Sequence, residues 1–119
     1  MAQRVIAVVK DLFFVARIRE TARLVGTELA FARTAEELGA ELERAKPSLV
    51  IIDLTTAGWD YEALFGRFGA TGAAVPVLGF TTHALARQTQ PLHARCSRVV
   101  TKETLTQELA TILKEAVAV

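Results

Sequence analysis

Apolar and polar positions follow two alternating periods along the chain, one typical of strands and one typical of helices. Apolar runs of strand length, most of them rich in β-branched residues, lie at residues 4–9, 28–32, 49–53, 75–80 and 98–101. Because strands that alternate with amphipathic helices form parallel sheets with crossover helices, we expect an α/β domain built on one parallel sheet. The unbroken apolar run Leu49–Ile52 predicts a strand that is buried on both faces.

Turn and capping residues predict where the helices begin and end. Helices are expected at about 12–25, 34–44, 61–68 and 104–116. Gly26 should end the first of them. Capping boxes at Thr34–Glu37 and Thr104–Gln107 should begin the second and the last. A further helix that begins at Thr82 should be ended or kinked by Pro91.

Polar side chains follow the ends of four predicted strands. Asp11 follows the first strand, and Asp53 ends the third. Thr81 follows the fourth strand, and Lys102 follows the fifth. For five such strands the order 2-1-3-4-5 is the commonest, and it puts the first and third strands side by side. Because parallel strands end at the same edge of a sheet, Asp11 and Asp53 should face one crevice, with the other two residues beside them.

These four residues suit phosphoryl chemistry. A carboxylate can attack phosphorus when a divalent cation and a lysine neutralise the oxygens of the transferred group. Mg²⁺ is commonly held by one or two carboxylates. The blocks that carry a family resemblance are Val8-Val9-Lys10-Asp11, Val50-Ile51-Ile52-Asp53, Pro76-Val77-Leu78-Gly79-Phe80-Thr81 and Val99-Val100-Thr101-Lys102. Through them, nearly the whole chain resembles a receiver domain of the response-regulator family, in the group of small stand-alone receivers similar to the chemotaxis one.

The resemblance implies both a fold and a function. The fold would be three-layered, doubly wound and flavodoxin-like, and the protein would be a signalling component of a two-component phosphorelay rather than an enzyme. A histidine kinase or phosphotransfer protein would phosphorylate Asp53, with Mg²⁺ held by Asp11, Asp53 and the backbone carbonyl of Thr55. Thr81 and Lys102 would then contact the phosphoryl group. The face of the fourth helix, fifth strand and fifth helix would change its affinity for a downstream protein or a second copy.

Lys10 departs from the family pattern, which has an acidic pair at the end of the first strand. Replacing an anion by a cation changes the charge by two units, each worth about 4 kcal/mol at ~4 Å and an effective dielectric of ~20. Millimolar metal binding is worth only about 4 kcal/mol in total. We therefore expect weakened Mg²⁺ binding unless Lys10 points away from the crevice, and we hypothesise an ion pair between Lys10 and Asp53 that stands in for the metal. Lys102 is followed by Glu103 where the family has a proline, so no cis peptide bond is expected there.

Other functions stay open from the sequence. The departures also fit a degenerate pseudo-receiver that binds partners or dimerises without phosphorylation. Asp11 could serve only as a helix cap and Asp53 only as a turn residue, while Thr81 or Thr82 could cap the next helix. Trp59, in a polar loop beside the crevice, is either a partner anchor or packed over its own loop. A flavodoxin-like enzyme or cofactor binder is disfavoured, because the turn Lys10–Phe13 has no glycine and no Ser/Thr cluster to hold a phosphate ester.

Composition narrows the class further. The chain has 119 residues with 14 Lys plus Arg and 13 Asp plus Glu, for a formal net charge of +1, and its basic residues are scattered. These values predict a single domain over residues 1–119 and argue against nucleic-acid binding. No apolar stretch reaches the ~20 residues of a membrane span and no signal peptide is evident, so a cytoplasmic protein without membrane contact is expected. Cys96 is the only cysteine, which excludes an internal disulfide. His83 and His93 have no partners at metal-ligand spacing and should be exposed.

Overall fold

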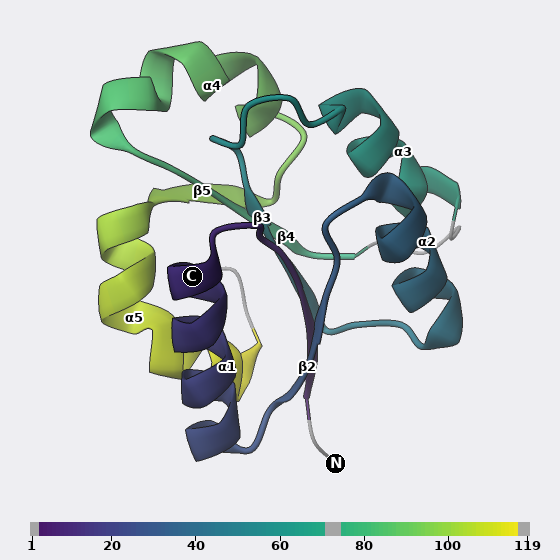
Figure 1. The fold of residues 1–119 in the computed structure, drawn as a ribbon, viewed down its shortest axis with the longest axis vertical. Helices are drawn as coiled ribbons and strands as arrows, with labels where there is room; N and C mark the ends of the chain where they lie inside the picture. Colours follow the sequence, from purple (N-terminus) through teal and green to yellow (C-terminus); the bar gives the residue numbers. More distant parts are fainter. Residues whose placement is uncertain (1–2, 71–74, 117–119) are drawn as a thin grey trace.

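One parallel sheet organises the structure. The computed structural model describes residues 3–70 and 75–116, and its five strands lie in the order β2-β1-β3-β4-β5 (Figure 1). The strands are β1 (Arg4–Val8), β2 (Glu28–Phe31), β3 (Leu49–Asp53), β4 (Val77–Thr81) and β5 (Arg98–Thr101). Every neighbouring pair is parallel. The doubly wound α/β fold and the strand order expected from the sequence are therefore confirmed, and the order reverses between β1 and β3.

Helices cover both faces of this sheet and make three layers. They are α1 (Leu12–Val25), α2 (Ala35–Arg44), α3 (Tyr61–Ala70), α4 (Ala86–His93) and α5 (Lys102–Glu115), with a short 3₁₀ helix, η1 (His83–Leu85), before α4. α1 packs beside α5 on one face, and α2 packs beside α3 on the other (Figure 1). Within residues 3–70 and 75–116, no helix has the length and apolarity that crossing a membrane requires.

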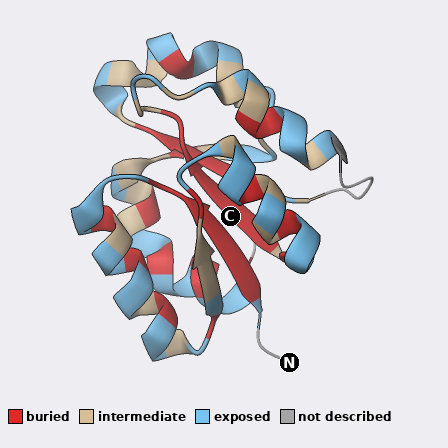
Figure 2. Cartoon of the chain, turned by 45° about the vertical axis from the view of Figure 1, so that its right-hand side comes forward, coloured by how far each residue is buried: buried red, intermediate tan, exposed pale blue. Residues whose placement is uncertain are grey.

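The sheet separates two apolar clusters, because its central strands are buried on both faces. Along β1, Val5 and Ala7 belong to the cluster under α1 and α5, whereas Ile6 and Val8 belong to the cluster under α2 and α3. β3 is buried along its whole length, as its apolar run predicts. Figure 2 shows the buried strands at the centre and the exposed outer faces of the helices. Replacing a buried residue such as Ile51 by Ala would lower the free energy of unfolding by about 2–5 kcal/mol. The close packing behind this cost makes the strands a rigid support for the polar residues at their ends.

Two helices differ from the sequence predictions. α5 begins at Lys102, because the hydroxyl of Thr101 accepts a hydrogen bond from the backbone N–H of Thr104 (3.1 Å) and caps the helix there. The capping box expected to begin at Thr104 is therefore wrong by one turn. α4 continues through Pro91 to His93 instead of ending before the proline. Pro91 is exposed, so the carbonyl that loses its partner one turn earlier can bond to water.

Local hydrogen bonds also set the start of α2 and of β4. The hydroxyl of Thr34 accepts from the N–H of Glu37 (3.0 Å), as expected. The Glu37 carboxylate, however, accepts from the N–H of Arg33 (2.7 Å) rather than from that of Thr34. β4 begins at Val77, after Pro76, because proline has no N–H to donate to the ladder. α4 begins at Ala86, after η1, rather than at the predicted Thr82. The other element ends agree with the predictions to within the usual fraying of one or two residues.

Candidate functional site

Asp11 follows β1 at the carboxyl edge of the sheet and caps α1. Its Oδ1 accepts hydrogen bonds from the backbone N–H groups of Phe13 (2.9 Å) and Phe14 (3.2 Å). The N–H of Phe14, opposed by slight burial and assisted by the charge of Lys102, holds the pKa of Asp11 below its usual value. Asp11 is therefore ionised at neutral pH, and it does have the capping role that the sequence left open.

Lys102 reaches the same rim from the end of β5. It is the first residue of α5, and its Nζ lies 3.6 Å from Oδ2 of Asp11 and 4.9 Å from the centre of the Phe14 ring. Side chains from the ends of the first and last strands therefore meet, as the strand order predicts. Because both charged groups are partly exposed, the pair contributes no more than about 1 kcal/mol to stability. Its importance is that the Lys102 ammonium is directed at Asp11.

Asp53 is the last residue of β3 and is only 7% exposed. Its Oδ1 accepts from the backbone N–H of Thr55 (2.8 Å) and from the Thr55 hydroxyl (2.6 Å), and its Oδ2 accepts from the hydroxyl of Thr56 (3.3 Å). A carboxylate that accepts from the N–H two residues later forms an Asx-turn. The turn role of Asp53 is therefore observed, and donors of its own loop occupy both carboxylate oxygens.

Tyr61 supports this loop, a role that the sequence pattern did not indicate. Its hydroxyl donates to the backbone carbonyl of Asp53 (2.7 Å) and accepts from the N–H of Thr56 (3.0 Å). Burial, together with the nearby Asp53 charge, raises the pKa of Tyr61 to about 12. The hydroxyl therefore stays protonated at neutral pH and ties the end of β3 to the start of α3.

Trp59 packs on the same loop. Its ring meets the Tyr61 ring edge to face, with the centroids 6.1 Å apart, and it lies half-buried against the cluster under α2 and α3. Packing over its own loop is thus observed, while a role as a partner anchor stays a prediction. Because Tyr61 contacts Asp53, the fluorescence of Trp59 should report changes in the Asp53 loop.

Thr81 ends β4 and is 3% exposed. Its hydroxyl oxygen accepts from the hydroxyl of Thr89 on α4 (2.9 Å), and Oγ1 of Thr89 lies 2.9 Å from Nε2 of His93. Thr82, not Thr81, caps the following helix by accepting from a backbone N–H of η1. His93 is half-buried, which corrects the expectation that it is exposed, whereas His83 is exposed as expected. A chain of polar contacts therefore links the rim to α4.

Lys10 is exposed between the end of β1 and Asp11. It forms no ion pair within residues 3–70 and 75–116, so the hypothesised Lys10–Asp53 pair is absent. Solvent around the ammonium screens its effect on the rim. Lys10 instead lines a pocket between α1 and β2.

These residues do not fit a tight Mg²⁺ site. Mg²⁺ demands oxygen ligands in near-octahedral geometry. Here one oxygen of Asp11 accepts from two N–H groups and the other faces Lys102, while Asp53 is bonded by the loop at Thr55 and Thr56. In the described part of the chain, no three His, Cys, Asp or Glu side chains are grouped so that they could hold a metal ion. Lys10 adds an exposed cation next to Asp11.

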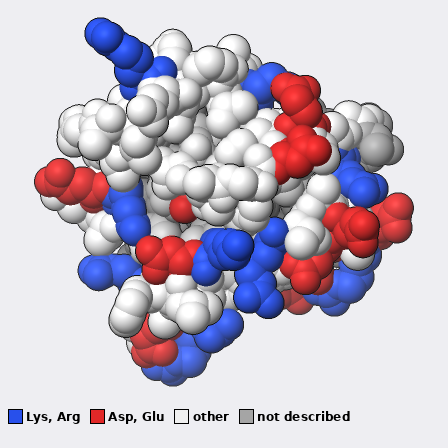
Figure 3. Space-filling view, turned by 45° about the horizontal axis from the view of Figure 1, so that its top comes forward, with Lys and Arg blue, Asp and Glu red and all other residues white. Residues whose placement is uncertain are grey.

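The carboxyl edge of the sheet carries charges of both signs. Figure 3, which brings this edge forward, shows acidic and basic side chains next to one another around an uncharged area. Among the described residues that this view shows, basic side chains are interspersed with acidic ones. This arrangement agrees with the scattered basic residues of the sequence.

Comparisons with known proteins identify the fold. No protein-family model matches the sequence, and no curated protein matches it. The receiver domain of the sensor histidine kinase PA1611 from Pseudomonas aeruginosa, solved with a magnesium ion in its active-site cleft, is similar with a TM-score of 0.76 and 20% identity, over 97% of each chain. The chemotaxis response regulator CheY4 of Vibrio cholerae has a TM-score of 0.73 and 22% identity, over 95% of this chain and 100% of that one.

NtrX from Brucella abortus has a TM-score of 0.75 and 18% identity, over 98% of this chain. The chain spans only 27% of that NtrX chain. At these identities the similarity concerns the fold alone. The chain therefore has the flavodoxin-like fold of response-regulator receiver domains.

Proposed function

We propose that the chain is a receiver-type signalling module of a two-component pathway that binds its protein partners without requiring phosphorylation. The observation that carries this proposal is the state of the two carboxylates. Asp11 caps α1 and faces Lys102, and Asp53 accepts hydrogen bonds from its own loop. A divalent ion at this rim would have to compete with those donors and with the Lys102 ammonium, and losing a helix cap alone costs about 1 kcal/mol. Millimolar metal binding corresponds to only about 4 kcal/mol, so the loss of one or two such hydrogen bonds would weaken metal binding well beyond the millimolar range.

Phosphorylation of Asp53 is a second candidate, favoured by Thr81 and Lys102. Both residues lie at the strand ends that the family resemblance gives them. In this candidate a carboxylate oxygen of Asp53 forms a bond to phosphorus while the P–N bond of a phosphohistidine breaks on a histidine kinase or phosphotransfer protein. Lys102 would leave Asp11 and pair with the phosphoryl oxygens.

In both candidates, the downstream partner or a second copy of the chain contacts the face formed by α4, β5 and α5. The contacts from Thr81 through Thr89 to His93 support this choice, because a change at the rim would reach α4 through them. The stand-alone organisation of the protein and its cytoplasmic location stay predictions.

Titration with Mg²⁺ and then with beryllium fluoride, a phosphoryl mimic, separates the two candidates. The readout is the fluorescence of Trp59, the only tryptophan. We expect no saturable change up to about 10 mM Mg²⁺, a concentration that would nearly fill a ~1 mM site. A saturable change on adding beryllium fluoride in the presence of Mg²⁺, lost in Asp53→Asn, would refute the phosphorylation-independent proposal and favour Asp53 as a working acceptor.

A further inference from the structure

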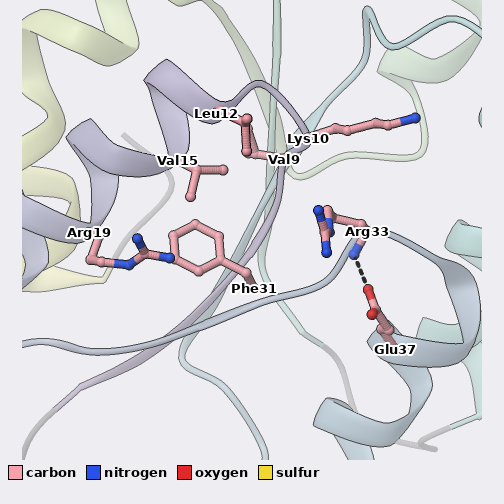
Figure 4. Close-up of a pocket in the computed structure, with 8 residues that line it drawn as sticks. All are labelled: Val9, Lys10, Leu12, Val15, Arg19, Phe31, Arg33 and Glu37. Carbon is pink, nitrogen blue, oxygen red and sulfur yellow. Dashed lines mark hydrogen bonds between the residues drawn. The ribbon is translucent and has the colours of Figure 1, made fainter.

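A pocket of about 260 Å³ lies between α1 and β2, beside the rim but outside it. Its apolar lining comes from Val9, Leu12, Val15 and Phe31. Figure 4 shows the Phe31 ring at its centre, with the aliphatic side chains above the ring. Leu12, on the pocket's edge, is 72% exposed. The pocket therefore offers an aromatic surface that continues onto an exposed apolar residue.

Three cationic side chains surround this apolar surface. Arg19, Arg33 and Lys10 line the pocket, and all are exposed. Figure 4 shows Arg19 on one side of Phe31 and the other two toward the opposite side, with the Lys10 ammonium directed away from the ring. In the described ranges 3–70 and 75–116, none of the three forms an ion pair.

The one acidic residue of the pocket, Glu37, offsets only one of these three positive charges. The Glu37 carboxylate accepts from the backbone N–H of Arg33 (2.7 Å), which holds it at the start of α2. The Arg19 guanidinium lies 5.2 Å from the centre of the Phe31 ring. A guanidinium stacked on a ring keeps its N–H groups free at its edge, where they can bind a carboxylate with two hydrogen bonds. The pocket therefore has an excess of positive charge next to an aromatic face.

We infer that this pocket binds a segment of a protein partner that carries a large apolar side chain next to a carboxylate. The apolar side chain would lie beside Phe31 and on Leu12, and the carboxylate would pair with Arg19, while Arg33 would add attraction from the other side of the ring. The volume favours a single side chain, since sites for whole small-molecule ligands usually measure about 300–1,000 Å³. Complementary charge would select the acidic neighbour and speed association.

This inference goes beyond the proposed function, because the pocket uses neither Asp53 nor the face of α4, β5 and α5. It also gives Lys10 a place. Lys10 stands at the rim where the family resemblance leads one to expect an acidic residue, and the same lysine adds a cation to the border of the pocket. Partner binding here would not depend on the phosphorylation state of Asp53.

The test is an NMR titration of the ¹⁵N-labelled chain with acetyl-Phe-Asp-amide. Amide shifts should saturate at Phe31 and Arg33 and at residues around Arg19. The neutral analogue acetyl-Phe-Asn-amide, and the peptide acetyl-Ala-Asp-amide, should each bind at least about fivefold more weakly, because each lacks one of the two features. Equal binding of all three peptides, or shifts confined to other surfaces, would overturn the inference.

Matched variants locate the site and identify its source of ligand. Arg19→Gln and Arg33→Gln should each weaken the acidic peptide about fivefold or more, whereas Arg17→Gln, an exposed arginine of the same helix outside the pocket, should leave the affinity unchanged. Unchanged thermal unfolding shows that each variant is folded. Phenylacetate carries the same two groups without a peptide backbone. If it binds more tightly than the peptide, the pocket is a site for a small acid, and the assignment to a protein segment is wrong.

Discussion

Replacing Lys10 by Asp should create measurable Mg²⁺ binding at the rim. The substitution changes the charge beside Asp11 by two units and supplies a further carboxylate. Because Lys10 is exposed, the dielectric constant that applies is close to that of water, and not the lower value of a partly buried site. Two charge units acting on a divalent ion at about 8 Å in a dielectric of ~80 amount to ~2 kcal/mol, or about thirtyfold in affinity. Direct coordination by the new carboxylate would add to this value.

The assay is a Mg²⁺ titration followed by Trp59 fluorescence and repeated by calorimetry. Lys46→Asp is the matched control, since Lys46 is also an exposed lysine without an ion pair in the described ranges, and it precedes β3 at the opposite edge of the sheet. We expect saturable binding only in Lys10→Asp. Absence of binding at about 10 mM Mg²⁺ would refute the reasoning. The Lys102–Asp11 contact and the Asp53 loop, rather than Lys10, would then be what prevents metal binding.

Other predictions concern the loop, the core and the helix cap. Tyr61→Phe removes the hydroxyl that hydrogen-bonds to the backbone of Asp53 and Thr56, and it should lower the free energy of unfolding by about 1–3 kcal/mol in urea denaturation. A change below ~0.3 kcal/mol would contradict the assigned role. Gly79→Ala should destabilise by about 1–3 kcal/mol, because its Cβ would lie 2.8 Å from the Cys96 sulfur. Adding Cys96→Ala should recover part of that loss, and strict additivity of the two changes would contradict the clash. The free energy of unfolding of Asp11→Asn should depend on pH differently from that of the parent. Since the folded pKa of Asp11 is lowered, its stabilisation is complete above the unfolded value of about 3.9 and is lost as the pH falls through the lower folded value. Urea unfolding between pH ~3 and ~6 should therefore show the parent losing its advantage over the variant at the acid end, and a constant difference would contradict the lowered pKa.

The sheet could be predicted from the sequence because burial alone decides it. A strand such as β3, apolar at every position from Leu49 to Ile52, can lie only in the middle of a covered sheet. The order of the strands then follows from handedness and short connections. The helix ends could not be predicted equally well, since they depend on single hydrogen bonds. Thr101 and Thr104 are both good caps, and only the end of β5 determines that Thr101 is the one used.

The site was predictable as a set of strand ends but not as a network. Asp11 and Lys102 meet because the order of the strands brings their elements to one edge. The partners of Asp53 depend instead on the path of the loop after β3. Tyr61 can bond to the Asp53 carbonyl only because that loop turns back, and no periodicity in the sequence encodes this turn. The direction of the Lys10 side chain is likewise set by the local backbone. The opposite charges of Lys10 and Asp53 suggested an ion pair, but charge alone does not bring the two side chains together, and the pair is not formed.

Lys10 links the rim and the pocket, and so one substitution bears on both proposals. At the rim its positive charge opposes a metal ion, whereas at the pocket the same charge favours an acidic partner. Lys10→Asp should therefore gain Mg²⁺ affinity and lose affinity for acetyl-Phe-Asp-amide, while Lys46→Asp should change neither. The two effects need not be equal, because the ammonium is directed away from Phe31 (Figure 4). A gain of metal binding with unchanged peptide binding would leave Arg19 and Arg33 as the cations that recognise the carboxylate and would restrict the influence of Lys10 to the rim.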